Sequence, residues 1–398
     1  MPDTRRRPRL PPLYLLGPAF VAAIAYVDPG NVAANVSAGS QFGFLLLWVI
    51  VAANLMASLV QYLSAKLGLV TGMSLPEAVA QRSRRSTRLA YWAQAELVAM
   101  ATDVAEVVGG AIALYLLFGL PLLWGGIITG AVSLVLLAVQ NRRGQRAFER
   151  VIVGLLAVIA IGFLSSLFVD PPGASEVAAG LLPRFDGAES VLLATAMLGA
   201  TVMPHAVYLH SGLTRDRHGR PEAGAPRRRL LKATRADVAV AMLLVAATHL
   251  QGRENTDSIE GAYYAVRDTL GAGVALLFAI GLLASGLAST SVGAYAGSMI
   301  MDGLLNVRIP LLTRRLVTLI PALVILGIGF DPSRALVLSQ VVLSFGIPFA
   351  LIPLVQLTND AALMGEDANR RLTTMLGWLI AAVITVLNAV LIYLTVVG

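Results

Sequence analysis

Long apolar segments recur along the whole chain and are separated by short polar connectors. We predict that eleven of them are membrane-spanning helices, at about residues 13–39, 43–70, 89–118, 121–140, 150–169, 189–213, 236–250, 271–300, 311–330, 333–356 and 373–397. A helix needs about 20 mostly apolar residues to cross a hydrocarbon layer of roughly 30 Å. The pattern therefore predicts an all-α integral membrane protein.

The first and the sixth span each contain residues that interrupt a helix. In the first, "VDPGNV" at 27–32 places Pro29, which has no amide hydrogen, beside Gly30, which tolerates nearly any backbone angle. In the sixth, "MLGATVMPHAVYLH" carries Pro204 near its middle. We expect unwinding around residues 25–31 and around Pro204. The carbonyls freed in this way fit only a cavity inside the bundle.

The two interruptions lie five spans apart, and five is an odd number. The second unit therefore enters the membrane from the opposite side, as in transporters that are built from inverted repeats. We predict two five-helix repeats at about 13–170 and 189–356, an eleventh helix at about 373–397, and a single transmembrane domain over 1–398.

The composition agrees with a membrane protein, and the charge indicates its orientation. Of 398 residues, 57% are hydrophobic and 13% are charged, and the net charge is +7. If the amino terminus is cytoplasmic, all of the 30 Lys and Arg residues lie on that side except Arg184, Arg253, Arg267 and Arg334. This asymmetry predicts a multi-pass protein with its carboxyl terminus outside. The basic residues thus indicate a lipid bilayer and not a nucleic-acid partner.

The seventh span is short. Its apolar stretch, 236–250, gives about 22 Å of helix at 1.5 Å per residue, which is less than the hydrocarbon thickness. Without this span the later arginines of the chain would lie outside. We therefore expect a thinned bilayer or extra non-helical residues to complete the crossing. The preceding segment, "RDRHGRPEAGAPRRRLLK", is interpreted as a solvated cytoplasmic connector, with binding to anionic lipid as the alternative.

Side chains at the two interruptions form a candidate cation site. Asp28 is a carboxylate at membrane depth, where such groups mark ion or proton paths, and Asn31 adds a neutral oxygen. Met203 offers a thioether, which favours transition metals over Mg²⁺ and Ca²⁺. The set predicts Mn²⁺ or Fe²⁺ as the transported ion. The alternative is a proline kink at Pro204 with a methionine that fills the core.

A second polar group runs along the third span. Glu96, Asp103 and Glu106 lie within about an 80° sector of one helix face, because steps of seven and three residues return to nearly the same side. Arg314 and Arg315 in the ninth span are their expected partners. The group fits either a water-filled proton path or a structural network of ion pairs.

Three further groups are candidates for proton transfer. Asp28 binds a metal only when it is ionised, so metal binding and protonation are linked at one carboxylate. His205 follows Pro204 directly and titrates near physiological pH unless its surroundings shift it. His210 near the inner end of the sixth span either joins this route or is a plain interfacial histidine.

The motifs "DPGN" in the first span and "MPH" in the sixth resemble those of the Nramp family, the natural resistance-associated macrophage proteins. Its bacterial manganese transporter branch is similar to "AYVDPGNVAANVSAGSQFGFLLLWVIVAANLMASLVQYLSAKLG", "AMATDVAEVVGGAI", "GATVMPHAVYLHSGL" and "DPSRALVLSQVVLSFGIPFALIPL", and the likeness covers nearly the whole chain. The resemblance implies a LeuT-like fold and proton-coupled import of Mn²⁺ or Fe²⁺ by alternating access across the bacterial cytoplasmic membrane.

The resemblance also implies roles for single residues. The metal ligands of the family correspond here to Asp28, Asn31 and Met203, to the backbone carbonyl of Ala25 or Ala200 in some states, and to Gln340 when the site is occluded. The acids and arginines of spans three and nine correspond to a proton exit route toward the cytoplasm.

Two alternatives remain within this fold. The seventh span is shorter than the family pattern, so a homologue that binds metal but is impaired in transport is the first. A sodium-coupled organic solute transporter is the second, and a thioether beside an aspartate argues against it. The chain has no cysteine and no nucleophile with a base partner. We therefore expect that the protein is not an enzyme and needs no cofactor besides the transported metal and the coupling proton. We also expect it to be a monomer.

Overall fold

The structure is a computed structural model that describes residues 18–143, 151, 154–163, 173–248, 258–307 and 309–397. All regular structure in these ranges is helical. The elements are α1 (Pro18–Ile24), η2 (Ala25–Val27), α2 (Pro29–Phe42), α3 (Leu47–Thr71), α4 (Leu75–Arg82), α5 (Arg85–Phe118), α6 (Leu122–Arg143), a helix at Gly154–Phe163, α8 (Ala174–Gly180), α9 (Gly187–Thr201), α10 (Pro204–His218), α11 (Ala225–Thr248), α12 (Ile259–Leu270), α13 (Ala272–Leu305), α14 (Leu311–Gly327), α15 (Pro332–Asn359), α16 (Ala361–Met364), η3 (Gly365–Asp367) and α17 (Arg371–Val397).

A helix lies at each of the eleven predicted spans, and the prediction of an all-α membrane protein is confirmed. Spans one and six are each divided between two helices, as their prolines predict. Six helices of the described ranges are long and apolar enough to cross a membrane, the pair α9 and α10 being counted as one. The ends of spans one and five at 13–17 and 164–169 lie outside the described residues.

The prediction for the seventh span was wrong at its start. Helix α11 begins at Ala225, eleven residues before the predicted boundary, and runs for 24 residues, or about 36 Å. Residues 225–235 therefore belong to the helix and not to a connector. Hydropathy marks only the apolar half, whereas Ala, Arg, Leu and Lys are strong helix formers whatever their solvent. Only residues 236–248 of this helix are apolar, about 20 Å, so a thinned bilayer or extra non-helical residues at the crossing stay a prediction.

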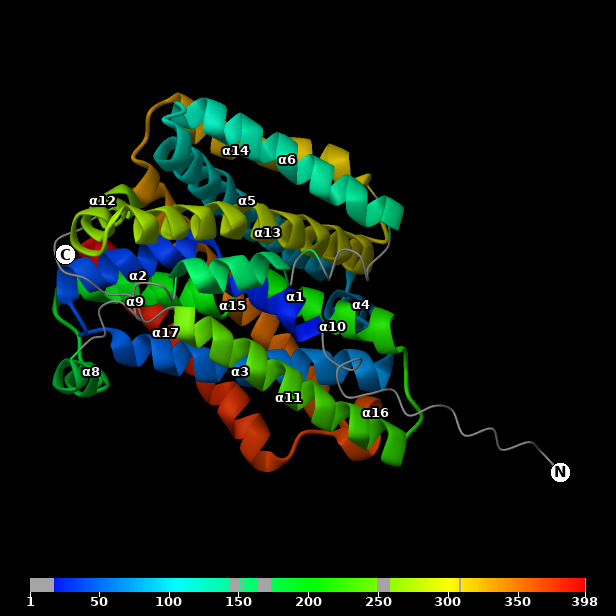
Figure 1. Cartoon of the computed structure of the whole chain (residues 1–398). Coiled ribbons are helices and arrows are strands. Elements are labelled where there is room, and N and C mark those ends of the chain that lie inside the picture. The colour runs from blue at the N-terminus through cyan, green and yellow to red at the C-terminus, as the bar shows by residue number, and fades with distance from the viewer. Residues whose placement is uncertain are drawn as a thin grey trace.

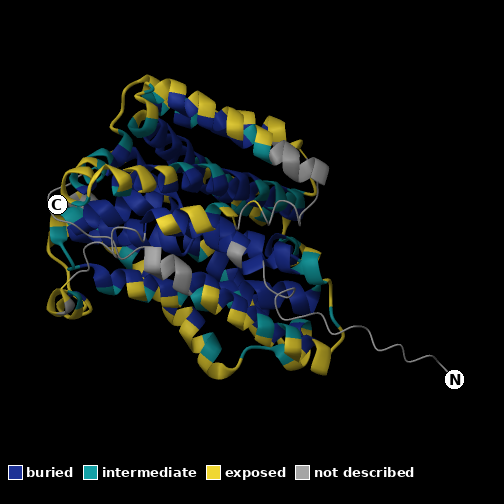
Figure 2. Ribbon diagram, in the orientation of Figure 1, coloured by how far each residue is buried: buried dark blue, intermediate teal, exposed yellow. Residues whose placement is uncertain are grey.

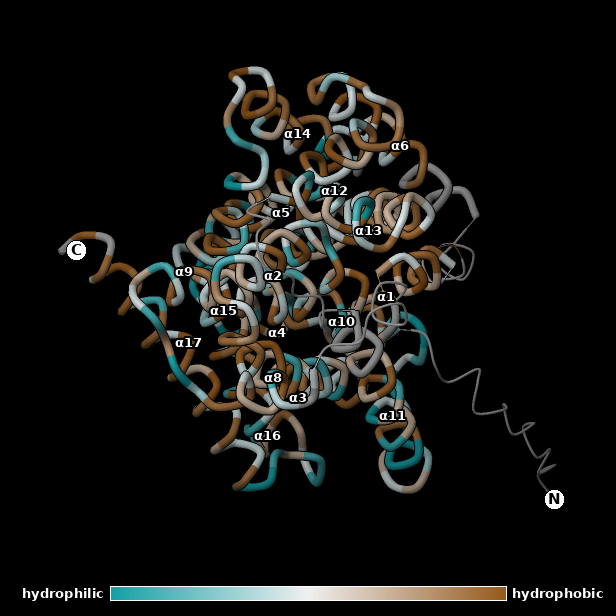
Figure 3. The backbone as a smooth tube through the Cα atoms, turned by 60° about the vertical axis from the view of Figure 1, so that its left-hand side comes forward, coloured by the Kyte–Doolittle hydropathy of each residue, from teal (hydrophilic) through white to brown (hydrophobic). Residues whose placement is uncertain are grey.

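The helices form layers around a buried centre. In Figure 1, α6 and α14 lie on one side next to α5 and α13, α3 and α11 lie on the other, and α1, α2, α9, α10 and α15 lie between them. Figure 2 shows that burial is concentrated in these central helices. Apolar side chains that remain exposed are frequent on the outer helices, as on α14 and α17, and Figure 3 shows their hydrophobic colouring. The exposed apolar faces are those expected against lipid.

Glycines allow the central helices to approach one another closely. A Cβ at Gly199 of α9 would lie 2.0 Å from the backbone oxygen of Gln340 on α15, and a Cβ at Gly109 of α5 would lie 2.0 Å from Cβ of Pro29. No side chain fits at either distance. Small residues at such crossings are typical of helix packing in membranes.

We expect Gly199→Ala to destabilise the protein by about 1–3 kcal/mol, because the added methyl group must push α9 away from α15. A fall in the thermal unfolding midpoint of the purified protein would measure this loss. Gly273→Ala is the control, since a Cβ at Gly273 of α13 meets nothing within 4 Å. An equal midpoint for both variants would contradict the close packing.

Candidate metal site

The first helix break is held together by Asp28. This residue is extended, with φ −80° and ψ 162°, and it precedes α2. Its Oδ1 accepts from the backbone N–H of Asn31 at 2.9 Å, and its Oδ2 accepts from that of Gly30 at 3.2 Å. The carboxylate therefore caps α2 and lies at the positive end of its helix dipole. The predicted unwinding over 25–31 is too long, because α2 already begins at Pro29.

Backbone carbonyls that the break releases find partners within the bundle. Asn31 Nδ2 donates to the carbonyl of Tyr26 at 2.5 Å, and the hydroxyl of Ser285 on α13 donates to the carbonyl of Val27. The amide oxygen of Asn31 accepts from Asn35 Nδ2 at 2.9 Å, which leaves that oxygen one further lone pair. Asn31 thus fixes the shape of the break and keeps one position for another ligand.

Gln340 of α15 reaches the same carboxylate from the opposite half of the chain. Its Nε2 donates to Asp28 Oδ2 at 3.0 Å and lies 3.3 Å from Ser339 Oγ. Its Oε1 is buried and has no hydrogen-bond partner in the described part of the chain. A Cβ at Gly30 would lie 1.7 Å from Gln340 Nε2, so only glycine admits this contact.

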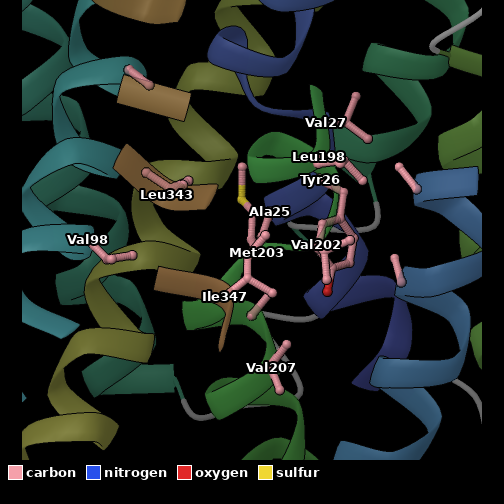
Figure 4. Close-up of a cluster of buried hydrophobic side chains, with 14 of the residues drawn as sticks. Ala25, Tyr26, Val27, Val98, Leu198, Val202, Met203, Val207, Leu343 and Ile347 are labelled. Carbon is pink, nitrogen blue, oxygen red and sulfur yellow. The ribbon is translucent and has the colours of Figure 1, made fainter. Parts of the chain in front are cut away.

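The second break lies between α9 and α10. Helix α9 ends at Thr201, Val202 and Met203 are non-helical, and Pro204 is the first residue of α10, where a missing N–H costs nothing. Met203 is fully buried. Figure 4 draws Met203, its sulfur in yellow, within the same buried cluster as Ala25 of the first break.

Gln340 joins the two breaks. Its side chain contacts Asp28, and its backbone oxygen faces Gly199, which directly precedes Ala200. Helix α15 therefore packs on α2 and on α9 at the same residue. The six predicted ligand residues, Ala25, Asp28, Asn31, Ala200, Met203 and Gln340, are all buried at 0–1% exposure.

A second polar cluster lies between α5 and α14. Arg315 forms an ion pair with Asp103, both at most 3% exposed, and its Nε donates to Ser133 Oγ of α6 at 3.2 Å. Arg314 pairs with Glu96 at 2.9 Å, and this glutamate is 21% exposed. The cluster thus reaches from a buried ion pair to a partly exposed one.

Glu106 lies between this cluster and the first break. It is fully buried and within electrostatic range of Asp103, Arg315 and Asp28. Thr290 of α13 is its neighbouring hydroxyl, but no hydrogen bond of ordinary geometry reaches either carboxylate oxygen from the described residues. Glu106 therefore interacts electrostatically both with Asp28 and with the ion pair of Asp103 and Arg315.

The two histidines of α10 face different neighbours. His205 Nδ1 lies 3.4 Å from Thr102 Oγ1 on α5, next to Asp103 in sequence. His210 Nδ1 lies 2.5 Å from Gln61 Oε1 on α3, and its Nε2 has no partner in the described ranges. The structure thus brings His205 to the acidic helix, and it turns His210 toward α3.

Sequence reasoning missed four polar residues that support the site. They are Asn35 beside Asn31, Ser339 beside Gln340, Thr102 beside His205, and Gln61 beside His210. Only Asn35 carried a local signal, since it lies four residues after Asn31 and so on the same helix face. Thr102 and Gln61 contact the two histidines from other helices, which the sequence pattern of α10 does not show. Ser339 directly precedes Gln340, and adjacent helical residues do not share a face.

Comparison with known proteins now identifies the family. The profile described as "Natural resistance-associated macrophage protein-like" matches residues 19–394. The chain belongs to the Nramp family. Nramp proteins are metal transporters and not enzymes.

Individual relatives support this membership. The "divalent metal cation transporter MntH" of Mycobacterium tuberculosis (strain H37Rv) is 70% identical over 395 residues, which cover 97% of this Nramp chain and 92% of the relative. The crystal structure of an Eremococcus coleocola manganese transporter has a TM-score of 0.84 and 32% identity, covering 98% of this chain and 88% of that one. Both proteins match this chain over nearly its full length.

A more distant structure shows the fold alone. MhsT in complex with L-phenylalanine has a TM-score of 0.63 at 12% identity, and the match covers 95% of this Nramp chain and 98% of MhsT. It is a LeuT-fold transporter, so the LeuT-like fold implied by the sequence resemblance is confirmed. The limits of the two repeats stay a prediction.

Proposed function

We propose that this protein imports Mn²⁺ or Fe²⁺ across the bacterial cytoplasmic membrane by alternating access, driven by protons. One observation carries the proposal. Asp28 is fully buried, and the partners it has in the described part of the chain are two backbone amides and one side-chain amide, with no ion pair. A buried carboxylate without a cationic side chain is a favourable place for a cation. The names of the relatives support a divalent metal as that cation.

The donor set favours a transition metal. Asp28 and Asn31 supply hard oxygens, Met203 supplies a soft sulfur, and the carbonyls of Ala25 and Ala200 lie at the two breaks. A site with both kinds of donor suits Mn²⁺ and Fe²⁺ better than Ca²⁺ or Mg²⁺. Gln340, whose buried Oε1 has no hydrogen-bond partner among the described residues, joins when the site closes.

The proposed proton route starts at Asp28 and uses the polar cluster of α5. Glu106 is within electrostatic range of Asp28, and the pair of Asp103 and Arg315 follows. The pair of Glu96 and Arg314 lies at the partly exposed part of the cluster. His205 approaches this route through Thr102, and His210 is a side branch toward α3. With the amino terminus in the cytoplasm, this route leads toward the cytoplasm. We propose that the protein works as a monomer.

Transport by the purified protein in liposomes tests the proposal. Under an inward proton gradient we expect Mn²⁺ to accumulate and a pH dye in the lumen to report acidification that depends on Mn²⁺. Metal binding without flux would favour the binding-only alternative. Accumulation of an amino acid under a sodium gradient, without Mn²⁺ uptake, would favour the organic solute transporter.

We expect Met203→Ala to retain part of the Mn²⁺ uptake but to admit Ca²⁺, because sulfur disfavours hard ions that already match the oxygen donors. Inhibition of Mn²⁺ uptake by excess Ca²⁺ measures the change. Met301→Ala, which removes another buried methionine from α13, is the control and leaves Ca²⁺ without effect. Continued exclusion of Ca²⁺ by Met203→Ala would remove this role of the sulfur.

A further inference from the structure

The first half of α11 carries a basic face that the proposed transport cycle does not use. It consists of Arg228, Arg229, Lys232 and Arg235, which are all exposed. This set is named the α11 basic face. No ion pair joins Arg228, Arg229 or Lys232 to a residue in the ranges that the structure describes, whereas the buried Arg227 pairs with Asp367 at 3.1 Å. The basic face is therefore open for a partner.

The basic face continues into the lipid-facing side of the same helix. Arg228, Lys232, Arg235 and Ala239 follow at steps of four, three and four residues, which keeps them within about a 60° sector. All four are exposed, and Ala239 begins the apolar half. The opposite side is buried against the bundle, at Leu231, Thr234, Val238 and Ala241. The helix thus presents one continuous outer side, basic at its start and apolar at its end.

The spacing along the helix places Lys232 near headgroup depth, with Arg229 and Arg228 about 4–6 Å further out along the axis. Lys232 precedes Ala239 by seven residues, or about 10 Å along the axis. The polar headgroup region adds roughly 5–8 Å on each side of the hydrocarbon layer. Arginine and lysine side chains are long enough to cover the remaining distance. Figure 3 shows hydrophilic turns of α11 beside its apolar ones.

One member of the face is held in place. The guanidinium of Arg235 lies 4.5 Å from the centre of the Tyr62 ring of α3. This contact fixes the end of the basic face that is nearest to the apolar half. The acidic groups beside it are engaged, since Asp367 pairs with Arg227, and Asp237 accepts from the backbone N–H of Ala19 at 3.0 Å.

We propose that the α11 basic face is a docking surface for the phosphate headgroups of anionic lipids in the surrounding bilayer. Charge complementarity and the shared outer side of the helix point to lipid, because a ligand there must also lie against the apolar half. Basic residues at a membrane surface attract anionic lipid, and the effect of several adds up.

Lipid binding to the full chain in neutral detergent tests this surface by native mass spectrometry with phosphatidylglycerol or phosphatidylcholine. We expect the unchanged protein to bind phosphatidylglycerol at least about tenfold more tightly than phosphatidylcholine. The triple variant Arg228→Gln, Arg229→Gln, Lys232→Gln is expected to lose about tenfold or more in affinity for phosphatidylglycerol. These side chains are exposed, so the fold is expected to be kept, which size-exclusion chromatography checks.

A matched control removes three charges elsewhere. The variant Arg84→Gln, Arg85→Gln, Arg370→Gln changes exposed residues outside α11 and is expected to keep most of the preference. Equal binding of both lipids by the unchanged protein would overturn the proposal. An α11 variant that binds phosphatidylglycerol as tightly as the unchanged protein would also overturn it. So would an equal loss in the control, because net charge alone would then attract the lipid.

Discussion

Replacement of Asp28 by alanine is expected to abolish metal transport, with Mn²⁺ uptake into proteoliposomes falling to that of protein-free vesicles. Asp28 is the one carboxylate in the two segments 25–31 and 201–205, and it is fully buried. The other candidate donors are neutral oxygens and a sulfur. They cannot offset the charge of a dication that has lost most of its water.

The control for this variant must account for the cap that Asp28 provides. Loss of an N-cap costs about 1 kcal/mol of stability by itself. Asp331 caps α15 in the same way, accepting from the backbone N–H of Arg334 at 2.6 Å, and it is exposed. Asp331→Ala is therefore expected to fold and to transport. Similar uptake by the two variants would remove Asp28 from the metal site.

The helix breaks were largely predictable from the sequence, because proline acts locally. Pro204 predicted the position of the second break within three residues. The first break was predicted to extend to residue 31, whereas in the structure it ends at Asp28. The difference has a simple cause. Proline is well tolerated as the first residue of a helix, so Pro29 starts α2 and does not prolong the unwound segment.

The start of α11 was not predictable from hydropathy. A hydropathy pattern finds the part of a helix that lies in lipid, and it carries no information about a helical extension into water. Residues 225–235 form such an extension, with a proline in its first turn and good helix formers after it. The α11 basic face was accordingly interpreted as part of a loop.

The contacts at the site depend on tertiary packing that one sequence does not contain. Gln340 and Asp28 are 312 residues apart, and their contact needs glycines at 30 and 199. Resemblance to a family pointed to Gln340, but no local pattern did. The two arginines of α14 were predicted as partners of the acids of α5. Which arginine pairs with which acid follows only from the crossing of the two helices.

The ion pair of Arg315 and Asp103 has a large expected effect on stability because of its burial. Arg315 is 0% exposed and Asp103 is 3% exposed at the side chain. Glu106 lies in electrostatic range of both. Removal of the guanidinium leaves two buried carboxyl groups without a cation. Breaking a buried pair on one side costs about 3–5 kcal/mol, which exceeds what the pair itself contributes.

We therefore expect Arg315→Met to lower the free energy of unfolding by about 3–5 kcal/mol, seen as a lower thermal unfolding midpoint in detergent. Arg314→Met is the matched control in the neighbouring residue. Its partner Glu96 is 21% exposed, so water can solvate the carboxylate that is left, and the loss of stability is smaller.

Adding Asp103→Leu to Arg315→Met is expected to restore part of the thermal unfolding midpoint, because it removes one of the two buried acids that lack a cation. An unchanged midpoint in Arg315→Met, or no recovery in the double variant, would mean that stranded charge is not what destabilises the protein. Partial recovery would leave Glu106 as the group that still lacks a cation, which ties the stability of the α5 cluster to the same acid that is within electrostatic range of Asp28.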